Sequence, residues 1–213
     1  MALLRVNPTR MQLTKLKNRL TTASRGHKLL KDKRDEMVRI FLLLIRRNKK
    51  LRQYVEQALG VALRGFVLAR VAMSKEALDE ALIYPVREAE LALSHANVMS
   101  VNVPKISYAE KKQEQSFFPY GLMNTSSELD RATAELSRVL PQLVELAELE
   151  KTCNMLADEI EKTRRRVNAL EYVMIPQLKE TIKYIRMKLD ENERGSLIRL
   201  MKTKEMIAKR EVK

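Results

Sequence analysis

An apolar residue recurs every three or four positions along the first third of the chain, and this repeat limits the possible folds more than any other feature. It starts at Leu13, and eleven of its first fourteen positions are apolar. A repeat sustained over so many turns is typical of a coiled coil, in which two helices bury a shared seam. The sequence therefore predicts one long helix within residues 1–75. The fourteen positions are Leu13, Leu16, Leu20, Ala23, His27, Leu30, Arg34, Met37, Phe41, Leu44, Asn48, Leu51, Val55 and Ala58.

A second repeat of the same kind runs through residues 126–213. Stepping from Leu129 to Ile185 by threes and fours meets seventeen positions, of which thirteen are apolar and four are Glu150, Arg164, Glu171 and Thr181. The phase passes through Pro141 and Pro176, although a proline inside a helix costs about 3 kcal/mol. We therefore expect one long helix that bends, with Pro176 setting a bend.

The segment between the two helices, residues 76–125, has a different character. "SKEALDEALIYPV" predicts a short helix that ends near Pro85. The β-forming residues that follow lie around Pro104 and predict a short β-hairpin on a loop-rich head. They are Val98, Val101, Val103, Ile106 and Tyr108. The expected fold is dominated by α-helix: a long antiparallel two-helix coiled coil with a small head that contains the hairpin.

The composition agrees with long helices. Trp is absent, aromatic residues make up 5% of the chain, and charged residues make up 32%. Such values are typical of coiled coils and leave few large side chains for a globular core. The most apolar run, residues 40–45, is far shorter than the roughly 20 residues that span a bilayer. We expect a soluble or membrane-peripheral protein.

The positive charge is concentrated towards the two termini. The net charge is +14, and residues 1–75 hold 19 Lys or Arg but 4 Asp or Glu. If the helices are antiparallel, residues 1–34 lie beside residues 162–213 and together carry 25 basic and 8 acidic residues. Residues 128–161, with nine acids and three bases, then face the basic middle of the first helix. The charge pattern therefore supports an antiparallel register and one strongly basic end.

No catalytic, cofactor-binding or metal-binding residue is predicted. The chain has no GxxxxGK[ST] phosphate loop, and Cys153 is its only cysteine. Neither His27 nor His95 has a cysteine or histidine at metal-ligand spacing. His27 falls on the seam, where we expect a packed polar residue, and Gly26 is expected to allow the helices to approach closely.

The run "EKTRRRV" raises the possibility of nucleic-acid binding. High positive charge favours it, but few aromatic residues are present to stack on bases. Three consecutive arginines on a helix also point in three directions, so they form no single row facing a groove. A basic coiled coil that binds nucleic acid or an anionic membrane surface remains the alternative.

Two long stretches, "NPTRMQLTKLKNRLTTASRGHKLLKDKRDE" and "RRRVNALEYVMIPQLKETIKYIRMKLDENERGSLIRLMKTKE", resemble the D subunit of the A/V-type rotary ATPases. The matching motifs are Pro-Thr-Arg at Pro8–Arg10, Gly-x-x-Leu-Leu-Lys at Gly26–Lys31, and the run at Arg165–Pro176. The "VMSVNVP" of the head is also similar. The resemblance covers both helices and is strongest to bacterial members.

This resemblance implies a non-catalytic central rotor shaft that couples ATP hydrolysis or synthesis to H⁺ or Na⁺ transport. Its terminal end would stand inside a hexamer of catalytic A and non-catalytic B subunits, which bind the ATP and Mg²⁺. Further implied partners are the small F subunit and the funnel-shaped subunit on the membrane ring, and the implied location is cytoplasmic and peripheral to the membrane. We hypothesise that a basic collar faces the hexamer. The collar residues are Lys15, Lys28, Lys33, Arg164, Arg165 and Arg166.

Overall fold

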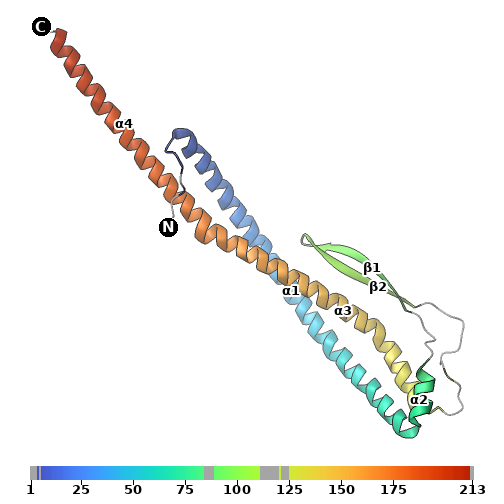
Figure 1. Ribbon diagram of the computed structural model, residues 1–213. Helices are drawn as coiled ribbons and strands as arrows, with labels where there is room; N and C mark the ends of the chain where they lie inside the picture. Colours follow the sequence, from blue (N-terminus) through green and yellow to red (C-terminus); the bar gives the residue numbers. More distant parts are fainter. Residues whose placement is uncertain (1–3, 5, 84–88, 111–119, 121–124, 212–213) are drawn as a thin grey trace. The chain divides into compact units, whose positions relative to one another are not determined.

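The computed structural model describes residues 4, 6–83, 89–110, 120 and 125–211 (Figure 1). Helix α1 spans Arg10–Ala72, α2 Lys75–Leu82, α3 Ser127–Asn168 and α4 Ile175–Glu211. A π-helical turn, η1, at Ala169–Met174 joins α3 to α4, and strands β1 (Ala89–Val98) and β2 (Val101–Glu110) form an antiparallel hairpin. The predicted fold class is confirmed. Helix α2 matches the expected short helix, while Pro85 lies outside the described residues.

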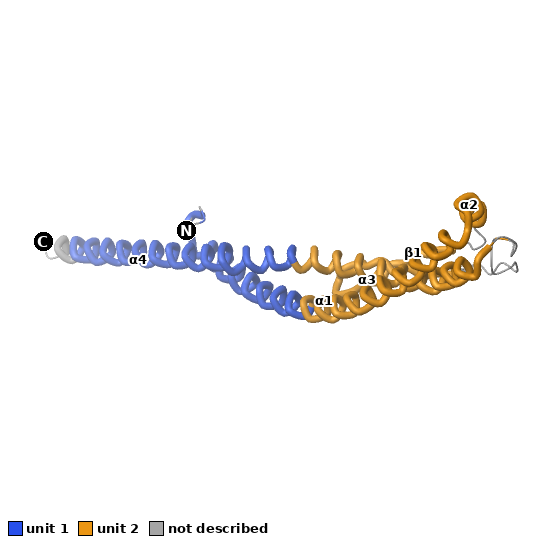
Figure 2. The backbone as a smooth tube through the Cα atoms, turned by 90° about the horizontal axis from the view of Figure 1, so that it is seen from below, with its two compact units in different colours: residues 1–36, 161–213 blue, residues 37–160 orange. Residues whose placement is uncertain are grey.

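The chain divides into two compact units, coloured separately in Figure 2. Unit 1 consists of residues 1–36 and 161–213, and unit 2 of residues 37–160. Each unit pairs part of α1 with a later helical segment in the antiparallel sense. Contacts within each unit follow the predicted register: Arg10 pairs with Glu193 in unit 1, and Arg52 lies 3.6 Å from Glu150 in unit 2.

The core of unit 1 is a stripe between α1 and α4. Leu16, Leu178 and Ile185 are buried, and the apolar side chains around them are partly buried. The backbone N–H of Leu4 donates to the hydroxyl of Thr181 at 3.3 Å, so the segment before α1 also lies against α4. The surrounding residues are Leu4, Leu13, Leu20, Ala23, Ile182 and Leu189.

Unit 2 has two cores. In the first, Met37 of α1 and Leu156 of α3 are buried together with Val101 and Val103 of β2. The second lies at the other end of this helix pair and joins Ala69, Ala81 and Leu129, which come from α1, α2 and α3. The hairpin of the predicted loop-rich head therefore packs onto the helix pair, a contact that the sequence did not predict.

The hairpin is longer than predicted. Its strands pair from Ala89 opposite Glu110 to Val98 opposite Val101, so the β-structure starts well before Val98. Met99 and Ser100 form the turn with φ values of 52° and 69°. Two residues with positive φ make a type I′ turn, whose twist matches that of the flanking strands. Pro104 lies within β2, away from this turn.

The C-terminal seam continues through the prolines, as predicted, but not at every expected position. Val167 and Leu178 are buried on either side of Pro176, whereas Glu171 and Met174, which were expected on the seam, are exposed. Both lie in η1, which contains no buried residue. Arg164 was also wrongly placed on the seam. The neighbouring residue, Thr163, is only 1% exposed and lies on the seam instead.

The turn η1 explains how the helix accommodates Pro176. The N–H of Ile175 donates to the carbonyl of Leu170, five residues earlier. A π-helical turn holds one extra residue and therefore displaces the carbonyl that the proline ring would otherwise meet. Prolines and π-turns are both causes of helix kinks. That Pro176 sets a bend stays a prediction.

Candidate partner-binding surface

All six predicted collar residues belong to unit 1. Lys15 and Lys28 are exposed on α1, and Lys33 is half-buried. Residues 164–166 are exposed on α3. Exposure makes these side chains available to a partner, so the next question is which of them lie together.

The contact between His27 and Glu171 fixes the register of this region. His27 Nε2 lies 3.3 Å from Glu171 Oε2, and the histidine side chain is 19% exposed. Because the helices are antiparallel, residues 164–166 lie at about the level of Lys33 on α1. Lys15 lies 18 positions before Lys33, or about 27 Å along a helix that rises 1.5 Å per residue. The structure thus groups Lys33 with the three arginines and separates Lys15 from them.

The three arginines differ in their contacts. Arg165 forms an ion pair with Glu161 one turn earlier on the same helix, and both side chains are largely exposed. Exposed pairs of this kind contribute roughly 0.3–0.5 kcal/mol, so Arg165 can exchange its partner at little cost. Arg164 and Arg166 have no ion pair within the described part of the chain.

The net charge of the whole chain resides in unit 1. Residues 1–36 and 161–213 hold 25 Lys or Arg and 11 Asp or Glu, a difference of +14. Residues 37–160 hold 16 of each and are neutral. Some of these opposite charges are paired between helices, as Arg47 is with Glu145. A partner of unit 1 must therefore tolerate or complement a strongly positive surface.

A second surface feature of unit 1 was not foreseen from the sequence. Because α1 begins at Arg10, opposite Glu193, no helix among the described residues runs beside the last part of α4. Its apolar side chains are more than half exposed, and a groove of about 430 Å³ begins beside Arg10. The exposed residues are Leu197, Ile198, Leu200, Met201, Met206 and Ile207. We had expected residues 1–34 to cover this stretch. The available signal was Pro8, which limits how early α1 can start.

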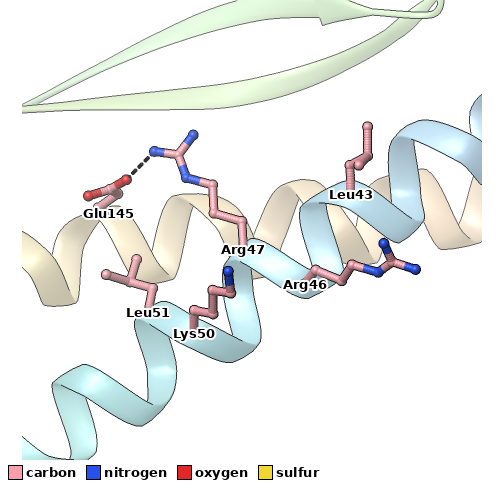
Figure 3. Close-up of a pocket in the computed structure, with 6 residues that line it drawn as sticks. All are labelled: Leu43, Arg46, Arg47, Lys50, Leu51 and Glu145. Atoms are coloured by element: carbon pink, nitrogen blue, oxygen red, sulfur yellow. Dashed lines mark hydrogen bonds and ion pairs between the residues drawn. The ribbon is translucent and has the colours of Figure 1, made fainter.

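Unit 2 carries a basic groove of about 520 Å³ on α1, shown in Figure 3. Arg46, Arg47 and Lys50 line it together with Leu43 and Leu51, and Glu145 of α3 closes one side by its ion pair with Arg47. The lining combines exposed cations with apolar side chains, which makes the groove a candidate contact for a partner.

Similarity to known proteins identifies the family. The family model that describes the D subunit of ATP synthase matches residues 12–205. This chain belongs to the ATP synthase D-subunit family. A protein of Clostridium novyi, named as the D subunit of a V-type ATP synthase, is 57% identical over 211 residues, which cover 98% of both chains. The protein of the same name from Acetivibrio thermocellus is 58% identical over 208 residues, covering 97% of this chain and 94% of its own.

Membership of the D-subunit family agrees with the resemblance that the sequence motifs indicated. Within the described residues, no helix is long and apolar enough to cross a membrane, and no group of three or more His, Cys, Asp or Glu could hold a metal ion. The match is to a component of an ATP synthase. It gives no support to the alternative of a coiled coil that binds nucleic acid or membrane.

Proposed function

We propose that this chain is the central-stalk rotor subunit of a V-type ATP synthase. It would transmit torque between the catalytic hexamer and the membrane ion-translocating ring, and so couple ATP hydrolysis or synthesis to H⁺ or Na⁺ transport. The observation that carries the proposal is the 54–58% identity, over nearly the full length, to proteins named as D subunits of V-type ATP synthases.

The architecture of each unit suits such a role. Torque has to pass along the chain without loss in flexible joints, and helices packed along a continuous seam resist twisting better than a chain of loops. The buried stripes in both units provide this packing. The protein is non-catalytic in this proposal, and the catalytic A and non-catalytic B subunits of the hexamer bind ATP and Mg²⁺.

Unit 1 is the part that we assign to the hexamer. Its charge of +14 suits acidic or carbonyl-rich loops lining the inside of the ring. Individually weak, exposed ionic contacts would let the shaft turn, whereas a few tight buried pairs would hold it in one orientation. The exposed apolar end of α4 would slide against the ring without forming charge pairs.

Unit 2 would serve the remaining partners, the small F subunit and the funnel-shaped subunit on the membrane ring. Its basic groove and the exposed apolar residues of α1 are candidate contacts, among them Leu43, Val67 and Val71. The protein would then be cytoplasmic and peripheral, and it would meet the membrane only through these partners.

Co-expression with the other subunits of the V-type complex tests this proposal. We expect the chain to co-purify in a stable complex with the small F subunit, and to be required for ATP-driven ion transport by the full complex. Retention on DNA or anionic vesicles that salt abolishes, with no effect of the chain on the ATPase, would instead support the alternative.

A further inference from the structure

Strand β1 has an outer edge that faces away from the helices. The other edge of the hairpin, on β2, is held against α3, because the N–H of Ile106 donates to Glu148 Oε2 at 2.8 Å. Residues 89–95 of β1 are all exposed. Figure 1 shows the hairpin alongside α3.

The register defines which backbone groups of β1 point outwards. A two-residue turn closes on a hydrogen-bonded pair, here Val98 and Val101, and bonded pairs then alternate with non-bonded ones along the strands. The non-bonded pairs are Leu93 with Ile106, Leu91 with Tyr108, His95 with Pro104, Asn97 with Asn102, and Ala89 with Glu110. The outward N–H of Ile106 and the missing N–H of Pro104 both agree with this assignment. Leu91, Leu93 and His95 therefore direct their N–H and C=O groups into solvent.

This edge lacks the usual protection against pairing. Exposed edge strands normally carry lysine, proline or a bulge that prevents another strand from adding to them. Strand β1, "AELALSHANV", has Glu90 as its single charged residue, contains no proline, and pairs without a bulge along its length. At ten residues it is also longer than most strands.

Leu91 and Leu93 lie on one face of the hairpin together with their cross-strand neighbours Tyr108 and Ile106. Leu91 and Leu93 are 54% and 73% exposed, while their cross-strand neighbours Tyr108 and Ile106 are half-buried. An apolar row thus crosses the hairpin and ends, uncovered, at the β1 edge. A third strand would extend this row with apolar side chains at alternate positions.

We propose that the β1 edge at Leu91–His95 receives an extended segment of another subunit of the complex by strand addition. Outward N–H and C=O groups spaced two residues apart are matched by a strand, whereas a helix has already used its own backbone groups. The segment carries apolar residues at alternate positions to cover Leu91 and Leu93. This inference rests on the proposed function, because the strand comes from a partner in the assembly.

Hydrogen exchange in the purified complex and in the isolated full chain tests the proposal. Assembly and ATPase activity are confirmed first, so a chain that does not assemble counts against the proposed function and not against this inference. We expect the amides of Leu91, Leu93 and His95 to exchange at least tenfold more slowly in the complex. The inward amides of Ala92 and Ser94, already bonded within the hairpin, serve as internal controls. Equal exchange of the outward amides in both states would overturn the proposal.

A proline at position 93 distinguishes hydrogen bonding of a partner strand to the β1 backbone from mere burial of the Leu93 side chain. Leu93→Pro removes an outward N–H but no bond of the hairpin, so the inward amides should stay protected in the isolated chain. In the complex, the assembly-dependent protection of Leu91 and His95 should be lost. The matched variant Leu93→Thr keeps the N–H and a residue that favours strands. The assembly-dependent protection of Leu91 and His95 should therefore remain in this variant. Protection that survives in Leu93→Pro, or is lost equally in both variants, would contradict strand addition.

A second copy of the chain is the competing occupant. Light scattering of the isolated chain distinguishes the two, because a monomer with unprotected outward amides is expected. A dimer in which these amides are protected would overturn the proposal in favour of pairing between two β1 edges.

Discussion

A Cβ added to Gly65 of α1 would lie 2.9 Å from the Cβ of Ala132 of α3. Carbon atoms do not pack this closely, so the two helices approach each other here only because residue 65 has no side chain. Buried Ala62 and Ala69, one turn away on either side, continue the close contact. The three-and-four spacing of the first repeat continues beyond Ala58 with the small residues Ala62, Gly65 and Ala69, and the short distance between the helices explains their size.

Gly65→Ala is expected to destabilise unit 2. The new methyl group must push the helices apart or shift Ala132, and overpacking of this kind costs about 1–3 kcal/mol. Urea unfolding followed by circular dichroism measures the loss. Gly60→Ala is the control: no atom lies within 4 Å of its added Cβ, so it should gain up to about 1 kcal/mol from helix propensity. Equal shifts for both variants would disprove the steric explanation.

Pro176→Ala is expected to raise the free energy of unfolding modestly, by about 1 kcal/mol, because η1 already keeps the ring away from the carbonyl and the variant mainly restores a backbone N–H. The turn η1 should persist, since losing its extra residue would shift Leu178 and Ile185 along the seam. Thermal unfolding and the ratio of ions transported to ATP hydrolysed are the measurements.

The transport ratio decides whether the motor uses a bend at Pro176. A stable variant with a lower ratio supports a mechanical role, whereas a stable variant with a normal ratio rejects it. Pro141→Ala, inside α3 in unit 2, controls for the general effect of removing a helical proline.

Alanine at Lys33 and residues 164–166 together should weaken binding of the chain to the hexamer and lower coupled turnover. These four lie at one level of unit 1, whereas Lys15 lies about 27 Å away along α1. Lys15→Ala alone should therefore have a smaller effect. The difference should shrink as salt rises, because exposed charges are screened. Unchanged assembly and coupling in the fourfold variant would reject the collar.

Because of Tyr120, the stability of unit 2 should fall as the pH rises into the alkaline range. Its hydroxyl donates to Asp130 Oδ1 at 2.8 Å, and burial raises its pKa to about 12, with the Asp130 carboxylate acting in the same direction. The folded pKa exceeds the unfolded value of about 10, so this contribution is complete below pH 10 and is lost as the pH rises to 12. Between these values the unfolding free energy of the native chain should fall more steeply than that of Tyr120→Phe. Parallel curves in urea titrations would contradict the assignment.

The candidate surface was only partly predictable. The sequence identified the basic residues, the helices that carry them and the approximate register, but it wrongly placed Arg164 on the seam, where Thr163 is buried instead. Gly26 was expected at a close helix contact, yet no atom lies within 4 Å of a Cβ added there, and Gly65 makes that contact instead. Both glycines are compatible with a helix. Which one meets the partner depends on the distance between the helices.

The sequence by itself determined the two long helical arms, their antiparallel pairing and the family. A repeat of three and four positions and long motifs are local patterns, so they can be recognised in the sequence alone. Tertiary structure alone decided where the hairpin lies and which of its edges is open. Val101 and Val103 of β2 pack on Met37 and Leu156, and Glu148 binds the N–H of Ile106. Those contacts join residues far apart in the chain, and the β-forming pattern of a strand does not specify which surface it will cover.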